Sequence, residues 1–323
     1  MNRKDIGALV YLPEDKKIET YSAENLEAFT TIEDYWMKRE GLVFYPFDRT
    51  KQAFFFGKEK GEGRALEFEF SPNIQMSKME YETSVFMAQQ SIAANDFSKV
   101  VLARNEILTG NYSAQEAFQK AVTTYPDSFG YYVNLGEQQW VGASPELLLH
   151  FSENTLYTIA LAGTQPLNAN FTKKEHEEQE MVEQFIEEKL IKVGLPNFVK
   201  AEKQEAKFKT IKHLKTAYTA TANQETALEL LKNLQPTSAV CGLPRDVSFG
   251  FIQEFETMNR SFYSGVTGVL KKDSATFFVN LRCMRFFDKS VELFAGAGIT
   301  AESDASAEWE ETEKKIATIK ELL

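Results

Sequence analysis

The sequence contains few of the residues that form metal clusters or disulfides. Of its 323 residues only two are cysteines, Cys241 and Cys283, and only three are histidines. Two cysteines so far apart form neither a disulfide framework nor a zinc site, and three scattered histidines do not make a metal site. This cysteine usage is typical of a reducing compartment, so we expect a cytoplasmic protein.

The sequence also lacks long apolar runs and an excess of positive charge. No stretch approaches the length needed to span a bilayer, and the N-terminus lacks the apolar segment of a secretion signal. The formal net charge of −11 argues against nucleic acid or an anionic membrane as a partner, because both attract basic surfaces. An acidic protein that binds an anionic metabolite needs a local positive centre of lysine, arginine or a divalent metal.

Apolar and aromatic residues are abundant: 43% of the chain is apolar, and 26 residues are phenylalanine. Predicted strands come in runs and predicted helices in blocks, which differs from a regular βαβ alternation. With no Pro/Gly/Ser linker in the chain, we predict an α+β fold in which mainly antiparallel sheets form one large domain, with helices packed outside. The expected helices span 79–94, 174–193, 225–234, 247–256 and 308–323, and the expected strands span 42–47, 53–56, 66–70, 99–108, 130–135, 146–151, 155–162, 263–270, 276–287 and 291–294.

Two of these helices carry carboxylates that could share a divalent ion. Glu308, Glu311 and Lys315 lie three and four residues apart, so they share one face of the C-terminal helix. In the helix over 174–193, Glu178 falls on the apolar arc, where a carboxylate needs a metal, a cation or hydrogen-bond donors. Its residues Glu177, Glu180, Glu183 and Glu187 are expected to project elsewhere. Two glutamate helices favour a hard cation such as Mg²⁺, although solvated helix faces are the alternative.

Lys99 and Glu146 each begin an apolar strand and are candidates for a base and an acid. Lys99 shares its strand face with two apolar residues by two-residue alternation, and burial there would favour the neutral amine that a lysine base requires. A carboxyl held beside an apolar strand, as expected for Glu146, can stay protonated and serve as a general acid. Each residue is also compatible with an ordinary charged strand end.

Three further segments carry groups that suit an anion. Arg282 lies within an apolar stretch, where a guanidinium is uncommon unless it meets an anion, and its planar shape suits a carboxylate. An internal salt bridge is the alternative. Gly163 and Thr164 end a strand at which backbone N–H groups and a hydroxyl can bind an oxyanion, although the same residues suit an ordinary turn. His213 is either a proton carrier or a hydrogen-bonded structural imidazole.

Taken together, these segments resemble the chorismate-utilising enzymes, which comprise isochorismate, salicylate, anthranilate and aminodeoxychorismate synthases. The matching blocks follow the family's order from about residue 91 to the C-terminus, whereas residues 1–81 carry little of the resemblance. It implies a single chorismate-binding domain with a variable N-terminal part, 1–81, and a catalytic core, 91–323. The blocks are 99–104, 143–148, 161–164, Glu178, 213–214, 234–245, 260–265, 281–283, and 296–299 with 308–315.

Within this family the choice of chemistry depends on a few positions. Lysine at the Lys99 position resembles isochorismate and salicylate synthases, since anthranilate synthases typically have glutamine there. Aminodeoxychorismate synthases typically have a nucleophilic lysine where this chain has Ala162. The resemblance therefore implies isochorismate synthase, a water-adding isomerase without a glutamine amidotransferase subunit. Salicylate synthase and a chorismate-binding protein without turnover remain alternatives. Gln179 and Gln235 depart from the family pattern, in which many members have histidine at both positions.

The resemblance also implies roles for the candidate residues. Lys99 would deprotonate the water that attacks C2 of chorismate, and Glu146 would protonate the departing C4 hydroxyl. Mg²⁺ would be bound by Glu178 and Glu311, with Glu308 assisting through water. We expect a monomer that acts in menaquinone or catechol siderophore biosynthesis. The implied substrate-binding residues are Ala162, Gly163, Thr164, His213, Tyr263, Arg282, Gly296 and Lys315.

Overall fold

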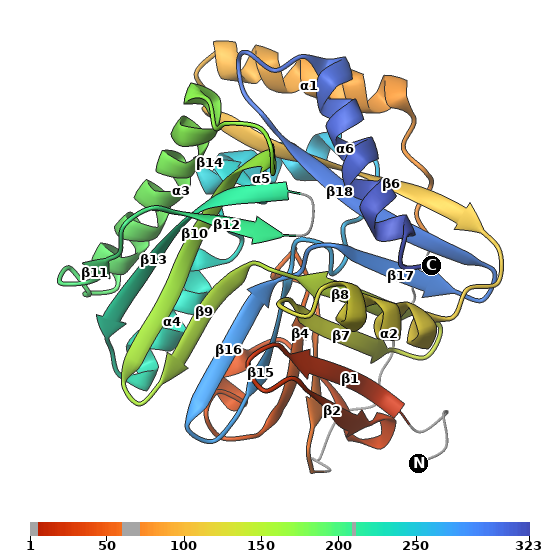
Figure 1. The fold of residues 1–323 in the computed structure, drawn as a ribbon, viewed down its shortest axis with the longest axis vertical. Coiled ribbons are helices and arrows are strands. Elements are labelled where there is room, and N and C mark those ends of the chain that lie inside the picture. The colour runs from red at the N-terminus through yellow and green to blue at the C-terminus, as the bar shows by residue number, and fades with distance from the viewer. Residues whose placement is uncertain (1–5, 60–71, 209–210) are drawn as a thin grey trace.

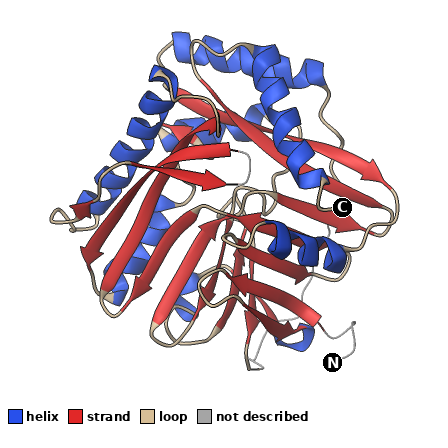
Figure 2. Cartoon of the chain, viewed as in Figure 1, coloured by secondary structure: helices blue, strands red, loops and turns tan. Residues whose placement is uncertain are grey.

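The strands of the computed structural model form two antiparallel sheets (Figure 1, Figure 2). The structure describes residues 6–59, 72–208 and 211–323. Sheet A contains, in spatial order, β14 (Gly242–Leu243), β6 (Lys99–Thr109), β18 (Ser290–Ile299), β17 (Cys283–Phe287), β8 (Gln139–Ser144), β7 (Phe129–Asn134), β1 (Ile6–Leu12) and β2 (Lys17–Ser22). Sheet B contains β11 (Val199–Lys200), β13 (Ile211–Thr221), β10 (Thr155–Pro166), β9 (Leu147–Ser152), β16 (Ser274–Val279), β15 (Val266–Leu270), β4 (Gly41–Tyr45), β5 (Ala53–Gly57) and β3 (Leu26–Phe29), with β12 (Gln204–Phe208) beside β13.

Six α-helices in the described residues cover the sheets from outside (Figure 2). α3 (Lys173–Lys192) packs on β10, α4 (Gln224–Leu234) on β9, and α2 (Ala114–Thr124) on β7 and β8. α6 (Ala305–Lys320) packs on β18 and also contacts α1 (Lys78–Ala93), while α5 (Arg245–Phe255) contacts β6. In the described part of the chain, no helix combines the length and the apolar character needed to cross a membrane.

Local sequence signals determine where the two helices nearest the C-terminal strand begin. Ser77 and Glu80 form a reciprocal capping box at the start of α1, which satisfies two N–H groups that the first helical turn leaves without partners. The Asp304 side chain accepts a hydrogen bond from the N–H of Ala307 at the start of α6. Its negative charge also interacts favourably with the positive end of the helix dipole.

Aromatic side chains fill the space between the two sheets, as the number of phenylalanines suggests. Phe44 of sheet B stacks on Phe262 with ring centroids 4.2 Å apart and meets Trp140 of sheet A edge-on at 6.0 Å. Trp140 in turn stacks on Phe294 of β18 at 5.5 Å. Such pairs contribute about 0.5–1.5 kcal/mol each beyond the burial of their surface, so this interior holds the two sheets together.

The predicted α+β architecture and the five predicted helices are confirmed, with one strand wrong. The stretch 276–287 is not one strand but two, β16 in sheet B and β17 in sheet A. Arg282 between them has a φ of 48°, a left-handed conformation that interrupts a strand. The patterns do not predict β13, because its buried face alternates polar with apolar residues, Lys212 and Thr216 among them. The predicted strand over 66–70 lies outside the described residues.

Candidate active site

The candidate residues lie where the chain passes from one sheet to the other. Glu146 connects β8 of sheet A with β9 of sheet B, and Arg282 connects β16 of sheet B with β17 of sheet A. Lys99 begins β6 in sheet A, next to the edge strand β14. His213 lies on β13 in sheet B, opposite Thr164 of β10. Residues far apart in the sequence are thereby placed together where the chain crosses between the two sheets.

Lys99 is buried, with 3% of its surface exposed, and its ammonium lies 3.1 Å from Oε1 of Glu178 on α3. Burial alone would raise the pKa of Glu178, but the Lys99 charge and hydrogen bond hold it below the ordinary value. Gly298 on the neighbouring strand makes room for this pair. A Cβ added there would lie 2.9 Å from Cε of Lys99 and 3.7 Å from Oε1 of Glu178.

Glu146 is held by its backbone and is surrounded by protein. Its carbonyl accepts a hydrogen bond of 3.0 Å from the N–H of Val279, and Ser144 Oγ accepts one of 3.3 Å from the Glu146 N–H. Burial raises the pKa of the Glu146 carboxyl to about 7, although the nearby charge of Lys99 acts in the opposite direction. Near neutral pH the carboxyl is therefore present in both protonation states, as a general acid requires.

The C-terminal helix α6 contributes an ammonium and two carboxylates. Lys315 Nζ donates a hydrogen bond of 2.8 Å to the carbonyl of Gly296 on β18 and lies 2.7 Å from Oε1 of Glu311. Glu308 is 4% exposed and accepts a hydrogen bond of 2.8 Å from Ser303 Oγ. Burial raises the pKa of Glu308, and the negative charge of Glu311 raises it further.

The donor set fits a hard cation in its chemistry, although the carboxylates are not gathered around one point. Glu178, Glu308 and Glu311 offer only oxygen ligands, which Mg²⁺ prefers. The repulsion between Glu308 and Glu311 is one that a cation would relieve. In the described part of the chain, however, no three His, Cys, Asp or Glu side chains are close enough to hold one ion. Binding of such a cation would therefore require Glu178 to leave its ion pair with Lys99 and Glu311 to leave its ion pair with Lys315.

The end of β10 lies against β13 through an irregular register between Ala162 and Thr164. Gly163 has a φ of 62°, and a Cβ there would lie 2.8 Å from the carbonyl oxygen of Glu175, so glycine is the residue that fits. Thr164 Oγ1 lies 3.1 Å from Nδ1 of His213. The predicted oxyanion-binding segment is therefore a bulged strand that packs against the start of α3.

His213 is held in its neutral form by its surroundings. Burial lowers the pKa of the imidazole to about 4, and the positive charges of Arg282 and Lys315 lower it in the same direction, while Glu178 opposes them. A neutral imidazole at pH 7 can donate one hydrogen bond and accept another. Of the two roles that the sequence allows for His213, this environment favours a hydrogen-bonding residue over a proton carrier.

Arg282 and Tyr263 lie in turns, not within strands. The expectation that Arg282 lies inside an apolar strand is wrong, because its left-handed conformation ends β16 and precedes β17. Its guanidinium lies over the ring of Tyr125, 5.4 Å from the centroid, and burial lowers its pKa. Tyr263 precedes β15, stacks on Phe294, and brings its hydroxyl to 3.2 Å from where a Cβ of Gly296 would lie. Tyr263 therefore adjoins the carbonyl that Lys315 binds.

The sequence patterns miss a buried polar network behind Glu178. Gln179 is fully buried and accepts a hydrogen bond of 2.9 Å from the N–H of Ala162 while donating to Glu183. Glu183 also accepts from Thr216 at 2.7 Å and pairs with Lys200 at 2.8 Å. The expectation that Glu183 projects away from the buried face is wrong. The four-residue spacing of Gln179 and Glu183, which places both on one helix face, is the signal that could have shown this.

Comparison with known proteins identifies the family. The model of a family described as chorismate binding enzyme matches residues 46–323. The chain belongs to this family. Membership confirms the resemblance seen in the sequence blocks and extends it toward the N-terminus, from about residue 91 to residue 46.

Two chorismate-binding relatives and one solved structure illustrate the extent of the similarity. Isochorismate synthase MenF of Escherichia coli strain K12 is 31% identical over 255 residues, which cover 73% of this chain and 58% of that protein. Isochorismate synthase EntC of the same strain is 28% identical over 288 residues, which cover 82% of this chain and 74% of that protein. The solved structure of MenF superimposes with a TM-score of 0.85 at 22% identity, covering 99% of this chain and 90% of that one, and shows the shared fold.

Proposed function

We propose that this protein is an isochorismate synthase that converts chorismate to isochorismate. The observation that carries the proposal is the placement of the Lys99 ammonium within electrostatic reach of Glu146, whose pKa is raised to about 7. A buried lysine and a carboxyl that titrates near neutral pH form the base and acid that the reaction needs. The similarity to MenF and EntC supports the same activity and makes menaquinone or siderophore synthesis the candidate pathways.

In the proposed reaction, one water is added at C2 and one hydroxyl leaves from C4. Lys99 would act as the base that takes a proton from the attacking water. Glu146 would donate its proton to the departing C4 hydroxyl, and the ring double bonds would shift between the two positions. Water enters and water leaves, so the product is an isomer of the substrate. No ammonia is consumed, which supports action without a glutamine amidotransferase subunit.

The positive groups around the site would bind the two carboxylates of chorismate. The positive charges of Arg282 and Lys315 both act on the neutral His213, and Lys315 also donates to the carbonyl of Gly296. Tyr263 adjoins Gly296, and the bulge at Gly163 and Thr164 offers further donors. Cations of this kind would offset a dianionic substrate within a protein whose net charge is −11.

We further propose that Mg²⁺ acts as the cofactor, held by Glu178 and Glu311 with Glu308 assisting through water. The ion would supply positive charge beside a substrate carboxylate. Dialysis against EDTA should abolish turnover, and added Mg²⁺ should restore it. Titration calorimetry should show that Glu311→Gln binds Mg²⁺ more weakly than the unaltered protein. Full activity after metal removal would contradict this part of the proposal and leave the isomerase activity standing.

The decisive experiment is incubation of the purified protein with chorismate and Mg²⁺, followed by chromatography of the products. Isochorismate should accumulate up to an equilibrium with chorismate, since the two are isomers. Fluorescent salicylate would instead identify a salicylate synthase, which also eliminates pyruvate. Binding of chorismate without any product would identify a protein that binds but does not turn over its substrate.

A further inference from the structure

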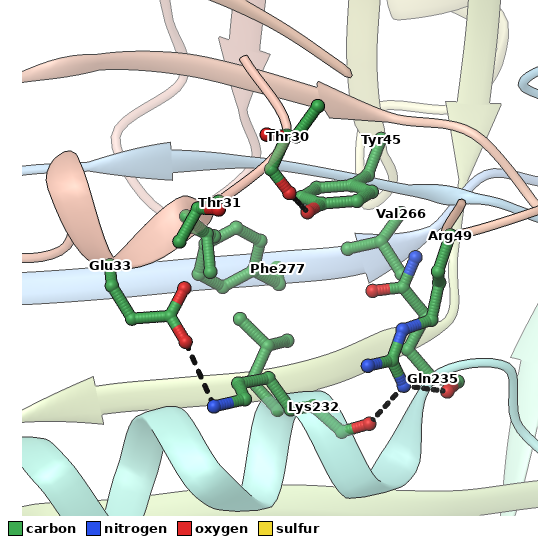
Figure 3. Close-up of a pocket in the computed structure, with 11 residues that line it drawn as sticks. Thr30, Thr31, Glu33, Tyr45, Arg49, Lys232, Gln235, Val266 and Phe277 are labelled. Atoms are coloured by element: carbon green, nitrogen blue, oxygen red, sulfur yellow. Dashed lines mark hydrogen bonds and ion pairs between the residues drawn. The ribbon is translucent and has the colours of Figure 1, made fainter. Parts of the chain in front are cut away.

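A pocket lies on sheet B (Figure 3). It has a volume of about 210 Å³ and is bounded by η3 (Ile32–Asp34), the end of β4, α4, β15 and β16. None of the candidate active-site residues lines it. The lining residues are Thr30, Thr31, Ile32, Glu33, Tyr45, Arg49, Leu231, Lys232, Gln235, Val266 and Phe277.

The inner wall of this pocket is apolar and aromatic. Phe277 and Val266 are buried on neighbouring strands of sheet B, and Phe277 stacks on Trp36 at 5.9 Å, which fixes its ring. Tyr45 presents its ring to the same space, while its hydroxyl donates a hydrogen bond of 2.8 Å to the carbonyl of Thr30. These side chains form a rigid surface against which the apolar part of a ligand can pack.

The rim of the pocket carries more positive than negative charge. Arg49 and Lys232 are cationic, and Glu33 is the one anionic residue among those that line it. Glu33 is already paired with Lys232, with Nζ and Oε1 2.9 Å apart. In the described part of the chain, no carboxylate lies within ion-pair distance of Arg49. Lys232 pairs with Glu229 as well, whereas Glu33 and Asp246 act on Arg49 only from beyond ion-pair distance. Arg49 is therefore the cation of this rim whose guanidinium is open to a carboxylate partner.

The position of Arg49 is fixed by the end of α4. Its Nη1 donates to the carbonyls of Lys232 at 2.6 Å and Gln235 at 2.9 Å, and Figure 3 shows these two bonds sharing one terminal nitrogen at the side of the pocket. The other guanidinium nitrogens are not used in these bonds. Burial and the positive charge of Arg245 lower the pKa of Arg49, while Tyr45, Asp246 and Glu33 act in the opposite direction.

We propose that this pocket binds a small organic anion that has a single apolar ring. The carboxylate of the ligand would pair with Arg49, whose planar fork suits it, and the ring would pack between Tyr45, Val266 and Phe277. The volume lies below the roughly 300–1,000 Å³ of pockets for larger ligands, which limits the ligand to about one ring. This site is independent of the proposed catalysis and is tested without measuring turnover.

The test uses benzoate as the probe and its neutral analogue benzamide as the reference. Binding is followed by the methyl NMR signals of Val266, which lies in the pocket wall, and by titration calorimetry. Benzoate should shift the Val266 signals and should bind roughly tenfold more tightly than benzamide, because a charge-assisted hydrogen bond is lost with the amide. Absence of a Val266 shift, or equal affinity for both probes, would overturn the proposal.

Arg245 offers a matched control for Arg49. Its Nη1 also caps the end of α4, donating to the carbonyl of Asn233 at 2.8 Å, but it does not line the pocket. Arg49→Met should weaken benzoate binding by roughly tenfold, whereas Arg245→Met should leave it within about twofold. Equal weakening in both variants would mean that helix capping, not direct contact, is responsible, and would reject the site.

The candidate active site also carries cations, so benzoate binding there has to be separated. Arg282→Met removes a cation from that site and leaves the pocket on sheet B unaltered. The Val266 response to benzoate should persist in this variant. Its loss would show that the response is transmitted from the active site and would overturn the proposal of a separate site. Because the Val266 signal is read in the unaltered protein as well, the test does not depend on any variant's folding.

Discussion

At the scale of single residues, one ammonium interacts with two carboxylates that differ in protonation. Lys99 lies 3.1 Å from Glu178 and lowers its pKa by its charge and hydrogen bond, while burial raises the pKa of Glu146 to about 7 against the charge of Lys99. The two carboxylates are thereby separated into one that stays charged and one that can carry a proton. Environments that push the pKa values of neighbouring acids apart are typical of acid–base catalysis.

Lys99→Gln should retain the fold but lose most of the activity. Glutamine can hydrogen-bond to Glu178 but cannot take a proton from water, and loss of a general base costs roughly 10²- to 10⁴-fold. Steady-state kinetics with chorismate measure the loss, and thermal unfolding checks the fold. The exposed Lys289 provides the control, since Lys289→Gln should keep full activity. Unchanged turnover by Lys99→Gln would refute the assignment of the base.

The pH profile of kcat/KM should show a limb set by Glu146. The acid form is the active one, and its pKa is raised to about 7, so activity should be highest below this value and fall as the pH rises through it. In Glu146→Gln the side chain is neutral at every pH but has no proton to give. The variant should be slow, and this limb should be absent from its profile. A wild-type profile without a descending limb near pH 7 would contradict the role of Glu146.

At the scale of elements, strand β18 approaches Lys99 so closely that a side chain at Gly298 would contact it. A Cβ at Gly298 would lie 2.9 Å from Cε of Lys99 and 3.4 Å from its Nζ. β6, the strand that begins at Lys99, is held by antiparallel pairing along ten residues of β18. If a Cβ were added at position 298, the Lys99 side chain would therefore move and the backbone would not. The strand thus determines where the ammonium lies.

Gly298→Ala should therefore reduce activity more than stability. The added methyl group displaces the end of a flexible side chain, and a misplacement of about 1 Å can cost roughly 10²-fold in rate. Kinetics and thermal unfolding should be measured side by side. Gly250→Ala on α5 is the control, because a Cβ there meets nothing within 4 Å. A Gly298→Ala enzyme with normal kcat/KM would show that Lys99 tolerates displacement.

At the scale of the whole molecule, a buried ion pair joins neighbouring strands of sheet A. Arg285 of β17 is paired with Glu292 of β18, and both side chains are buried. Glu292 also accepts hydrogen bonds of 2.7 Å from Asn105 of β6 and from Asn73. Three neighbouring strands and the segment before α1 therefore meet at one carboxylate, whose charge is satisfied only when all of them are in place.

Arg285→Met should destabilise the protein by about 3–5 kcal/mol, because it leaves the carboxylate of Glu292 buried without its cation. Urea unfolding measures the loss. The double variant Arg285→Met with Glu292→Met removes both charges and should recover part of the stability. If the double variant lost as much as the sum of two independent substitutions, the pair would not act as a coupled unit.

Several features of the fold and site follow from residue patterns alone. Helical spacing predicts five of the six α-helices in the described residues, because a helix needs only local periodicity and caps such as Ser77 and Asp304. It misses α2. The family blocks single out Lys99, Glu146 and Glu178, which the structure does bring together. The break at Arg282 and the burial of Glu183 do not follow from residue patterns, because both depend on the residues that pack against them in the folded protein.

Composition, local periodicity and short blocks of residues, all written along the chain, are enough to determine the class of fold and the family, and they single out the candidate side chains. Tertiary structure decided which of those side chains interact and in which protonation state they lie. Glu146 and Glu178 are both glutamates near apolar segments. Burial raises the pKa of Glu146, whereas the hydrogen bond and charge of Lys99, with the charges of Lys315 and Lys174, lower the pKa of Glu178. The physical reason is that a pKa depends on charges and solvent displaced in three dimensions, for which distance along the chain is no guide.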